Sequence, residues 1–346
     1  MFALLAVSTV PPRAAIRPGF EPCESAWRAS DVVVVTEGDA IDGRFDVLEV
    51  WRGTLEPGAE VEFPVLAAFA DAEKRLVRSL ERRPDRERAD LVSTVTGARM
   101  VLFLARDDAG ELVLADSWAV EGEQSVAWIE GGRVFARRQL ENPGPSVVTD
   151  FGTTEAELRT TDERLAALRR AFDRMSTFED PLERALAMRA MCREPFDFVR
   201  ERAFDELVRV GPTGEAVLRD MVLDAADRTL LPYSVGALAR AAGDRAPVVL
   251  TELLGAEIDF WASVPLPVDW YATTAPVHPT VRSARTEHLP RLVEILVHLR
   301  RGGDSTRDVV REVRRIFTTR APLVAVPDDE LQVVRLCDAF LAEFGG

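Results

Sequence analysis

The sequence predicts an α+β protein with a β-rich N-terminal domain, residues 20–150, followed by an all-α domain, residues 154–346. Two patterns lead to this division. Short β-branched runs fill the first part, whereas apolar residues recur at helical spacing in the second. Between the two parts stands the breaker sequence Asn142-Pro143-Gly144-Pro145, which places the boundary near residues 150–155.

The strands of the first part are expected in a simple order. Residues 31–50 contain two β-branched runs joined by a Gly- and Asp-rich connection, which is typical of an antiparallel pair. A third run follows Pro57-Gly58, and a helix is expected over 68–90. Strand signals return over 98–118 and in a hairpin across Gly131-Gly132. This order is typical of a small closed or partly open β-barrel of the OB type, which removes exposed strand edges by closing on itself.

The second part is expected to consist of helices with short connections, so that neighbours pack as antiparallel hairpins. The helices are predicted over 154–175, 180–192, 195–210, 213–227, 229–242, 245–262, 286–301, 305–318 and 327–344. Asp180-Pro181 predicts a capped helix start, and Gly211, Gly243 and Gly302 fall where helices should end. The Pro-rich segment 264–285 breaks this pattern and predicts a long loop, either functional or locally disordered.

Charge and hydropathy exclude two classes of partner. The formal net charge is −15, and Lys74 is the only lysine among 43 basic residues, with no segregated basic face to attract a nucleic acid. The mean hydropathy is −0.03, and the apolar run at the N-terminus is shorter than the roughly 20 residues of a transmembrane helix. We therefore expect no nucleic-acid partner and no membrane span.

The three cysteines, Cys23, Cys192 and Cys337, lie too far apart for a zinc site or a Cys-x-x-C motif and allow at most one disulfide. We expect buried or unreactive thiols and no cofactor. The N-terminal apolar run fits either a clipped signal peptide, with small residues at Ala14 and Ala15, or a buried strand. A start codon chosen too far downstream would account for the missing basic residues before this run. The compartment stays open, with an extracytoplasmic location slightly favoured over a cytoplasmic one.

Part of the N-terminal domain resembles bacterial domains related to tissue inhibitors of metalloproteinases and the netrin module, over roughly residues 23–120. The matching residues are Cys23, Ala29 to Val35, Phe45, Val47, Val50, Trp51, Gly53, Gly97 and Met100 to Leu104. The resemblance implies an OB-type fold. Inhibitory members use a disulfide-anchored N-terminal cysteine to chelate a protease zinc, and this domain departs from them because it has no second cysteine to anchor Cys23.

The helical part resembles HEAT repeats. Residues 198–222 match the repeat pattern at Val199, Arg200, Ala203, Leu207, Gly211, Val217, Leu218 and Val222, and a looser copy contains Val235, Leu238, Gly243, Val249 and Leu253. The resemblance implies an α-solenoid whose repeats bury their apolar faces on one another and present a concave surface.

The residues available for chemistry are few. His278, His288 and His298 fall within 21 residues, but their spacing places them on different sides of a helix or in the loop, and no HExxH motif is present. No Gly-x-Ser-x-Gly or phosphate-binding loop appears, so we predict no metal site and no catalytic residue. The adjacent aromatics Trp270 and Tyr271, together with His278, form either a partner-binding loop or a hydrophobic cover over helix ends.

The sequence therefore predicts a non-enzymatic protein-binding or scaffold protein that acts through its helical-repeat surface and the 264–285 loop. Two alternatives stay open. One is an extracytoplasmic protease-inhibitor-like or sensor protein acting through the N-terminal barrel, and the other is an uncharacterised hydrolase. The partner protein and the oligomeric state are not indicated by any motif.

Overall fold

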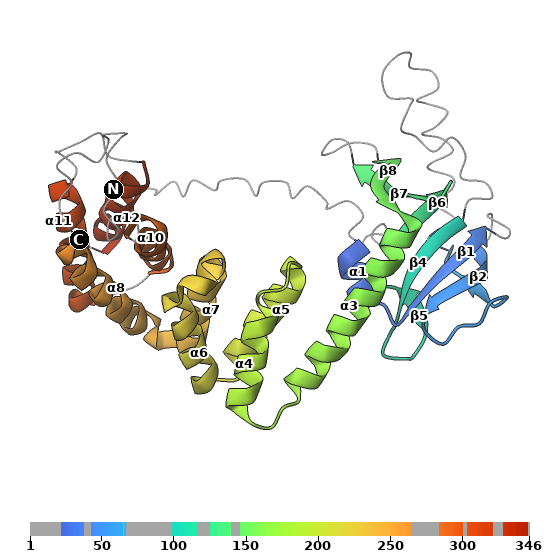
Figure 1. Cartoon of the computed structure of the whole chain (residues 1–346), viewed down its shortest axis with the longest axis horizontal. Helices are drawn as coiled ribbons and strands as arrows, with labels where there is room; N and C mark the ends of the chain where they lie inside the picture. Colours follow the sequence, from blue (N-terminus) through green and yellow to red (C-terminus); the bar gives the residue numbers. More distant parts are fainter. Residues whose placement is uncertain are drawn as a thin grey trace, which may run out of the picture. The chain divides into compact units, whose positions relative to one another are not determined.

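The computed structural model describes residues 22–37, 43–64, 66, 99–115, 125–139, 146–264, 284–299, 303–320 and 328–344. An antiparallel β-sheet is followed by a helical region, so the predicted α+β class is confirmed (Figure 1). The chain divides into two compact units, Met1–Ala171 and Phe172–Gly346, which are described separately below. None of the described helices is both long and apolar enough to cross a membrane.

The first unit is built on a sheet of eight strands. The strands are β1 (Asp31–Glu37), β2 (Arg44–Arg52), β3 (Glu60–Glu62), β4 (Arg99–Arg106), β5 (Leu112–Leu114), β6 (Val126–Glu130), β7 (Arg133–Gln139) and β8 (Ser146–Thr154). They pair in the order β3-β2-β1-β4-β6-β7-β8, with β5 paired to the end of β4, and every pairing is antiparallel. The predicted hairpins β1–β2 and β6–β7 are both present.

The predicted OB-type barrel, closed or partly open, is not confirmed by this topology. Within the described residues β3 and β8 end the path and do not pair with each other, so the sheet is open. Two further elements differ from the prediction. A short helix, α1 (Pro22–Arg28), precedes the first strand, and β8 continues the sheet beyond the breaker sequence 142–145 by pairing with β7. The breaker sequence therefore stands between two consecutive paired strands and not at the end of the sheet.

The centre of the sheet is buried on both faces. Val33 and Val35 of β1 pack with Leu102 and Trp128 in one core cluster, and the alternating residues Val32 and Val34 are equally buried on the opposite face. A strand covered on both faces requires a continuous apolar run, which explains the Val32 to Val35 sequence.

Helix α3 (Glu155–Ser176) is joined to the strands by ion pairs from two of its acidic residues. Glu155 lies 3.0 Å from Arg99 of β4, and the buried Asp162 lies 2.6 Å from Arg52 of β2. Arg52 also binds the end of α1, because its Nη2 donates a hydrogen bond to the carbonyl oxygen of Ala26 at 2.6 Å. A cation at the C-terminus of a helix satisfies its last carbonyls and complements its dipole.

The second unit contains antiparallel helices. They are α4 (Pro181–Met191), α5 (Asp197–Arg209), α6 (Pro212–Leu223), α7 (Leu231–Ala242), α8 (Ala246–Ser263), α10 (Leu289–His298), α11 (Asp304–Arg320) and α12 (Asp328–Phe344). Short 3-10 turns, η2 (Ala225–Leu230) and η3 (Gly243–Arg245), and a π turn, η4 (Ala284–His288), fill connections. These bounds follow the predicted helices closely, whereas the helix predicted over 68–90 lies outside the described residues.

The helices of the second unit form two layers. In one layer α5 packs against α7, α7 against α10, and α10 against α12, while in the other α4 packs against α6 and α8 against α11. Caps set the ends of these helices as predicted: Asp180 accepts a hydrogen bond from the amide of Leu182, and Gly243 ends α7 at a φ of 56°. The layer of α5, α7 and α10 carries the candidate site.

Candidate functional site

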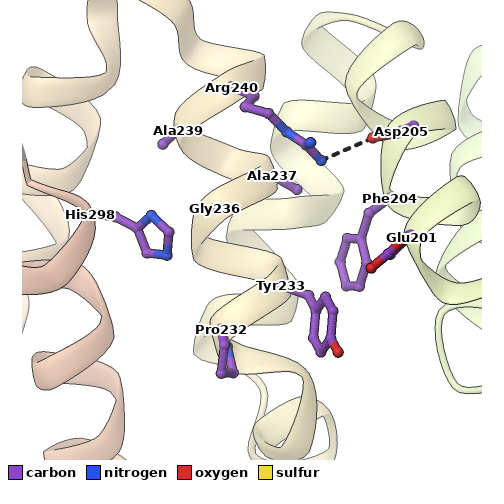
Figure 2. A pocket seen from close by; sticks show the side chains of 10 residues that line it. All are labelled: Glu201, Phe204, Asp205, Pro232, Tyr233, Gly236, Ala237, Ala239, Arg240 and His298. Atoms are coloured by element: carbon purple, nitrogen blue, oxygen red, sulfur yellow. Dashed lines mark ion pairs between the residues drawn. The ribbon is translucent and has the colours of Figure 1, made fainter. Parts of the chain in front are cut away.

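A surface groove crosses α7 between α5 and α10 (Figure 2). Its volume is about 600 Å³, within the range typical of ligand-binding clefts. The groove is lined by Glu201, Phe204 and Asp205 of α5, by Pro232, Tyr233, Gly236, Ala237, Ala239 and Arg240 of α7, and by His298 of α10. We call this surface the α7 groove.

The floor of the α7 groove is hollow because of the residues that α7 places there. Gly236, Ala237 and Ala239 have little or no side chain, while the flanking helices carry larger ones. On α5, Glu201 and Asp205 are one helical turn apart and therefore lie on the same face. Local helical spacing thus positions both carboxylates at one wall of the groove.

An aromatic pair forms part of the same wall. The rings of Phe204 and Tyr233 are stacked with centroids 5.9 Å apart and planes 9° from parallel. Phe204 is buried and fixes this pair, whereas Tyr233 is half-buried and contributes to the surface. The guanidinium of Arg200 lies 5.2 Å from the Tyr233 ring centroid, a cation–π geometry.

One ion pair bridges the groove from α5 to α7. Arg240 Nη2 lies 3.0 Å from Asp205 Oδ1, and both side chains are about half exposed, at 58% and 50% (Figure 2). Exposed pairs of this kind stabilise a protein by only ~0–1 kcal/mol, so a ligand can replace this pair at small cost. Glu201 is exposed and forms no ion pair with any residue that the structure describes.

His298 forms the opposite wall and packs on Gly236. A Cβ atom at position 236 would lie 3.1 Å from His298 Cε1, so the missing side chain makes room for the imidazole. His298 also lines a second hollow of about 340 Å³, with Gly243, Asp244, Ala246, Pro247, Leu250 and Leu299. His298 therefore lines both hollows, and the second one lies at the turn between α7 and α8.

A buried carboxylate holds the start of α7 in place. Asp227 of η2 is fully buried and accepts hydrogen bonds from Arg189 at 3.0 Å and from Arg193 at 2.8 Å. These arginines come from α4 and the residues after it. Because a buried carboxylate is costly without a partner, the two arginines constrain the segment that leads into the helix carrying Tyr233.

A second buried cluster holds α10. Glu257 of α8 pairs with Arg291 of α10 at 2.9 Å, and its other oxygen lies 2.9 Å from His288 Nδ1. Arg291 also donates to the carbonyl oxygen of Leu223 at the end of α6, at 3.0 Å. The His288 ring stacks on Phe260 with centroids 3.4 Å apart. These contacts position the helix that carries His298.

The predicted site residues have different outcomes. Trp270, Tyr271 and His278 lie outside the described residues. His288 belongs to the cluster around Glu257, and His298 lines the α7 groove, so the structure does not bring these two histidines into one site. Across the described ranges, no three His, Cys, Asp or Glu side chains are arranged to hold a metal ion. Cys23 lies half-buried in α1, whereas Cys192 and Cys337 are fully buried.

Sequence reasoning missed Glu201, Tyr233 and Arg240. The available signal was weak: two acidic residues four apart on one helix, facing a helix rich in Gly and Ala. Taken alone, these patterns are typical of a solvated face and of close helix packing. Only the packing of α5 against α7 brings Phe204 and Tyr233 together.

The chain was compared with protein-family models, with curated proteins and with solved structures, and none of them matches it. The class of protein is therefore defined by its own architecture, an open antiparallel sheet followed by an array of antiparallel helices with a groove on one layer.

Proposed function

We propose that this chain is a non-enzymatic protein-binding protein that acts through the α7 groove of its helical array. The observation that carries the proposal is the combination of a hollow of about 600 Å³ with a half-buried tyrosine on its wall. Tyrosine and arginine are the residues that most often dominate binding energy at protein interfaces. The α7 groove offers both, Tyr233 and Arg240, beside a carboxylate that no described residue neutralises.

We further infer that the helical part is a HEAT-like array. Two observations support this inference: the helices pack in two layers, and the residues matching the repeat pattern, such as Val199, Ala203 and Leu207, are fully buried. In helical-repeat proteins one layer presents an extended binding surface. The groove on the layer of α5, α7 and α10 fits that role.

The test compares proteins captured from the native host by the tagged full chain and by two variants. Tyr233→Ala removes the aromatic wall of the groove. The matched control, Arg219→Ala on α6, removes an exposed side chain that pairs with Glu252 and does not line the groove. Circular dichroism melting curves verify that both variants remain folded.

We expect a partner protein that is recovered with the wild type and the Arg219→Ala control but is reduced at least tenfold with Tyr233→Ala, the loss expected of an interface hot spot. Equal recovery by all three chains would exclude the groove as the binding surface.

A further inference from the structure

We propose that the partner binds the α7 groove as an extended segment that inserts an arginine or lysine side chain between Glu201 and Tyr233. This inference rests on the proposed binding function and adds the chemical class of the ligand. Charge, aromatic contacts and the form of the groove each support it.

The residues that line the groove include two carboxylates, those of Glu201 and Asp205, but one arginine, Arg240. Both carboxylates belong to α5, and Arg240 neutralises that of Asp205 alone. Arg200, the sequence neighbour of Glu201, lies over the Tyr233 ring at the groove wall and pairs with Asp197 at 2.9 Å, not with Glu201. His298 stands at the opposite wall and supplies no permanent positive charge. A basic side chain of the partner would complete the charge balance of the groove.

The two carboxylates are like charges one helical turn apart on α5. Like charges four residues apart on a helix destabilise it slightly, by an amount comparable to the gain from an opposite pair. Asp205 has its compensating arginine, and Glu201 has none among the described residues. This arrangement is expected where a residue is kept for binding rather than for folding.

The aromatic pair suits the stem and the charge of a basic side chain. Phe204 and Tyr233 form a stacked pair beside Glu201, and a guanidinium already lies 5.2 Å from the Tyr233 ring. Arginine and lysine bury their carbon stems on apolar surface while the charged end meets a carboxylate. Glu201 and Phe204 are three residues apart on α5, so the carboxylate and the aromatic pair of Phe204 with Tyr233 of α7 lie at the same wall.

The form of the groove favours an extended segment over a compact small molecule. The main hollow and its neighbour of about 340 Å³ share His298 as a lining residue, and together their lining residues extend from Glu201 of α5 to Pro247 at the start of α8. A single basic side chain fills part of the main hollow. The remaining surface of the groove can accommodate the ligand residues that precede and follow the basic residue.

The experiment selects binders from a library of random dodecapeptides displayed on phage, with the full-length chain as bait. The baits are the wild type, Glu201→Lys, Tyr233→Ala and a control, Glu163→Lys. The control makes the same charge change on an exposed residue of α3, far along the chain from the groove residues. Selected peptides are then synthesised, and their dissociation constants are measured by fluorescence anisotropy.

We expect peptides selected on the wild type and on Glu163→Lys to share an arginine or lysine at one position. Their affinity should fall at least about tenfold on Glu201→Gln, because a hydrogen bond between two charged groups is among the stronger contacts in proteins. Glu201→Lys should instead select peptides with aspartate or glutamate at that position.

Three outcomes would overturn the inference. Selected peptides that lose affinity in Tyr233→Ala but contain no shared basic residue would refute the inference that the ligand inserts an arginine or lysine. The proposed binding function would remain intact. Basic peptides that bind Glu201→Lys as well as the wild type would place the cation elsewhere. Self-association that is lost in Glu201→Lys, measured by sedimentation, would make a second copy of the chain the occupant.

Discussion

Two cysteines show how burial sets the chemistry of a single residue. Cys192 and Cys337 are fully buried, and burial raises the pKa of each thiol from 9.0 to about 12. This value includes the smaller effect of a neighbouring carboxylate, Asp227 for Cys192 and Asp338 for Cys337. The predicted buried thiols are therefore present at these two positions.

At pH 8 we expect Cys192 and Cys337 to resist alkylation, because a pKa near 12 lowers the reactive thiolate fraction by roughly 1,000-fold relative to an ordinary thiol. Iodoacetamide labelling followed by peptide mass spectrometry should find Cys23 modified first and all three modified in denaturant. In the variant Cys23→Ser no rapidly reacting thiol should remain. Labelling of Cys192 at the rate of Cys23 would contradict this prediction.

The glycine at position 53 is explained by the close approach of a buried side chain. Gly53 has a φ of 116°, and a Cβ atom there would lie 2.1 Å from Asp31 Oδ1. Burial alone would raise the pKa of Asp31, but hydrogen bonds from the Thr54 amide and the Ser30 hydroxyl lower it. The Trp-x-Gly pattern of the sequence thus ends at a glycine that a buried carboxylate requires.

At the scale of elements, Arg52 and Asp162 join β2, α1 and α3 of the first unit. Asp162 is fully buried, and burial raises its pKa from 3.8 despite the opposing effect of Arg52. The native state therefore holds the Asp162 proton more tightly than the unfolded chain does. As the pH rises above 3.8 through the native pKa, the ionised carboxylate reduces the free energy of unfolding.

We expect Asp162→Asn to remove this pH dependence. The free energy of unfolding of the wild type should fall relative to that of the variant as the pH rises through this window, since asparagine does not titrate. Urea titrations at several pH values between 4 and 7 measure the difference. Glu130→Gln makes the same charge change on an exposed residue of the same unit and should give a curve parallel to the wild type. A parallel curve for Asp162→Asn would show that Asp162 does not contribute.

The helix boundaries were predictable because their causes are local. Asp180 caps α4 through its own side chain, and Gly243 ends α7 with a left-handed φ. The element against which a strand or helix packs was harder to predict, because that contact joins residues from different segments of the chain. The strand β8 was missed because it follows the breaker sequence 142–145 and, among the described residues, pairs only with β7. The buried Asp227 binds Arg189 of α4 and Arg193 just after that helix, 38 and 34 residues earlier.

At the scale of the whole molecule, the net charge of −15 should draw a basic ligand toward the α7 groove. We expect the dissociation constant of an arginine-bearing peptide to rise severalfold between 0.1 M and 1 M salt, because the screening length falls from about 10 Å to about 3 Å. Fluorescence anisotropy measures the change. The same peptide with citrulline in place of arginine should show a smaller salt dependence, and equal slopes for both peptides would argue against electrostatic attraction.

The sequence alone determined the α+β class, the order of most strands, the positions of the helices and several of their caps. These features depend on residues within one or two turns of each other, where periodicity and capping act. The open edge of the sheet, the layers of helices and the α7 groove were decided by tertiary structure. Tyr233 and His298 are 65 residues apart in the chain, and no local pattern brings them to the same groove. Packing of α7 between α5 and α10 does so, because Gly236 and its small neighbours leave a hollow there that larger side chains would fill.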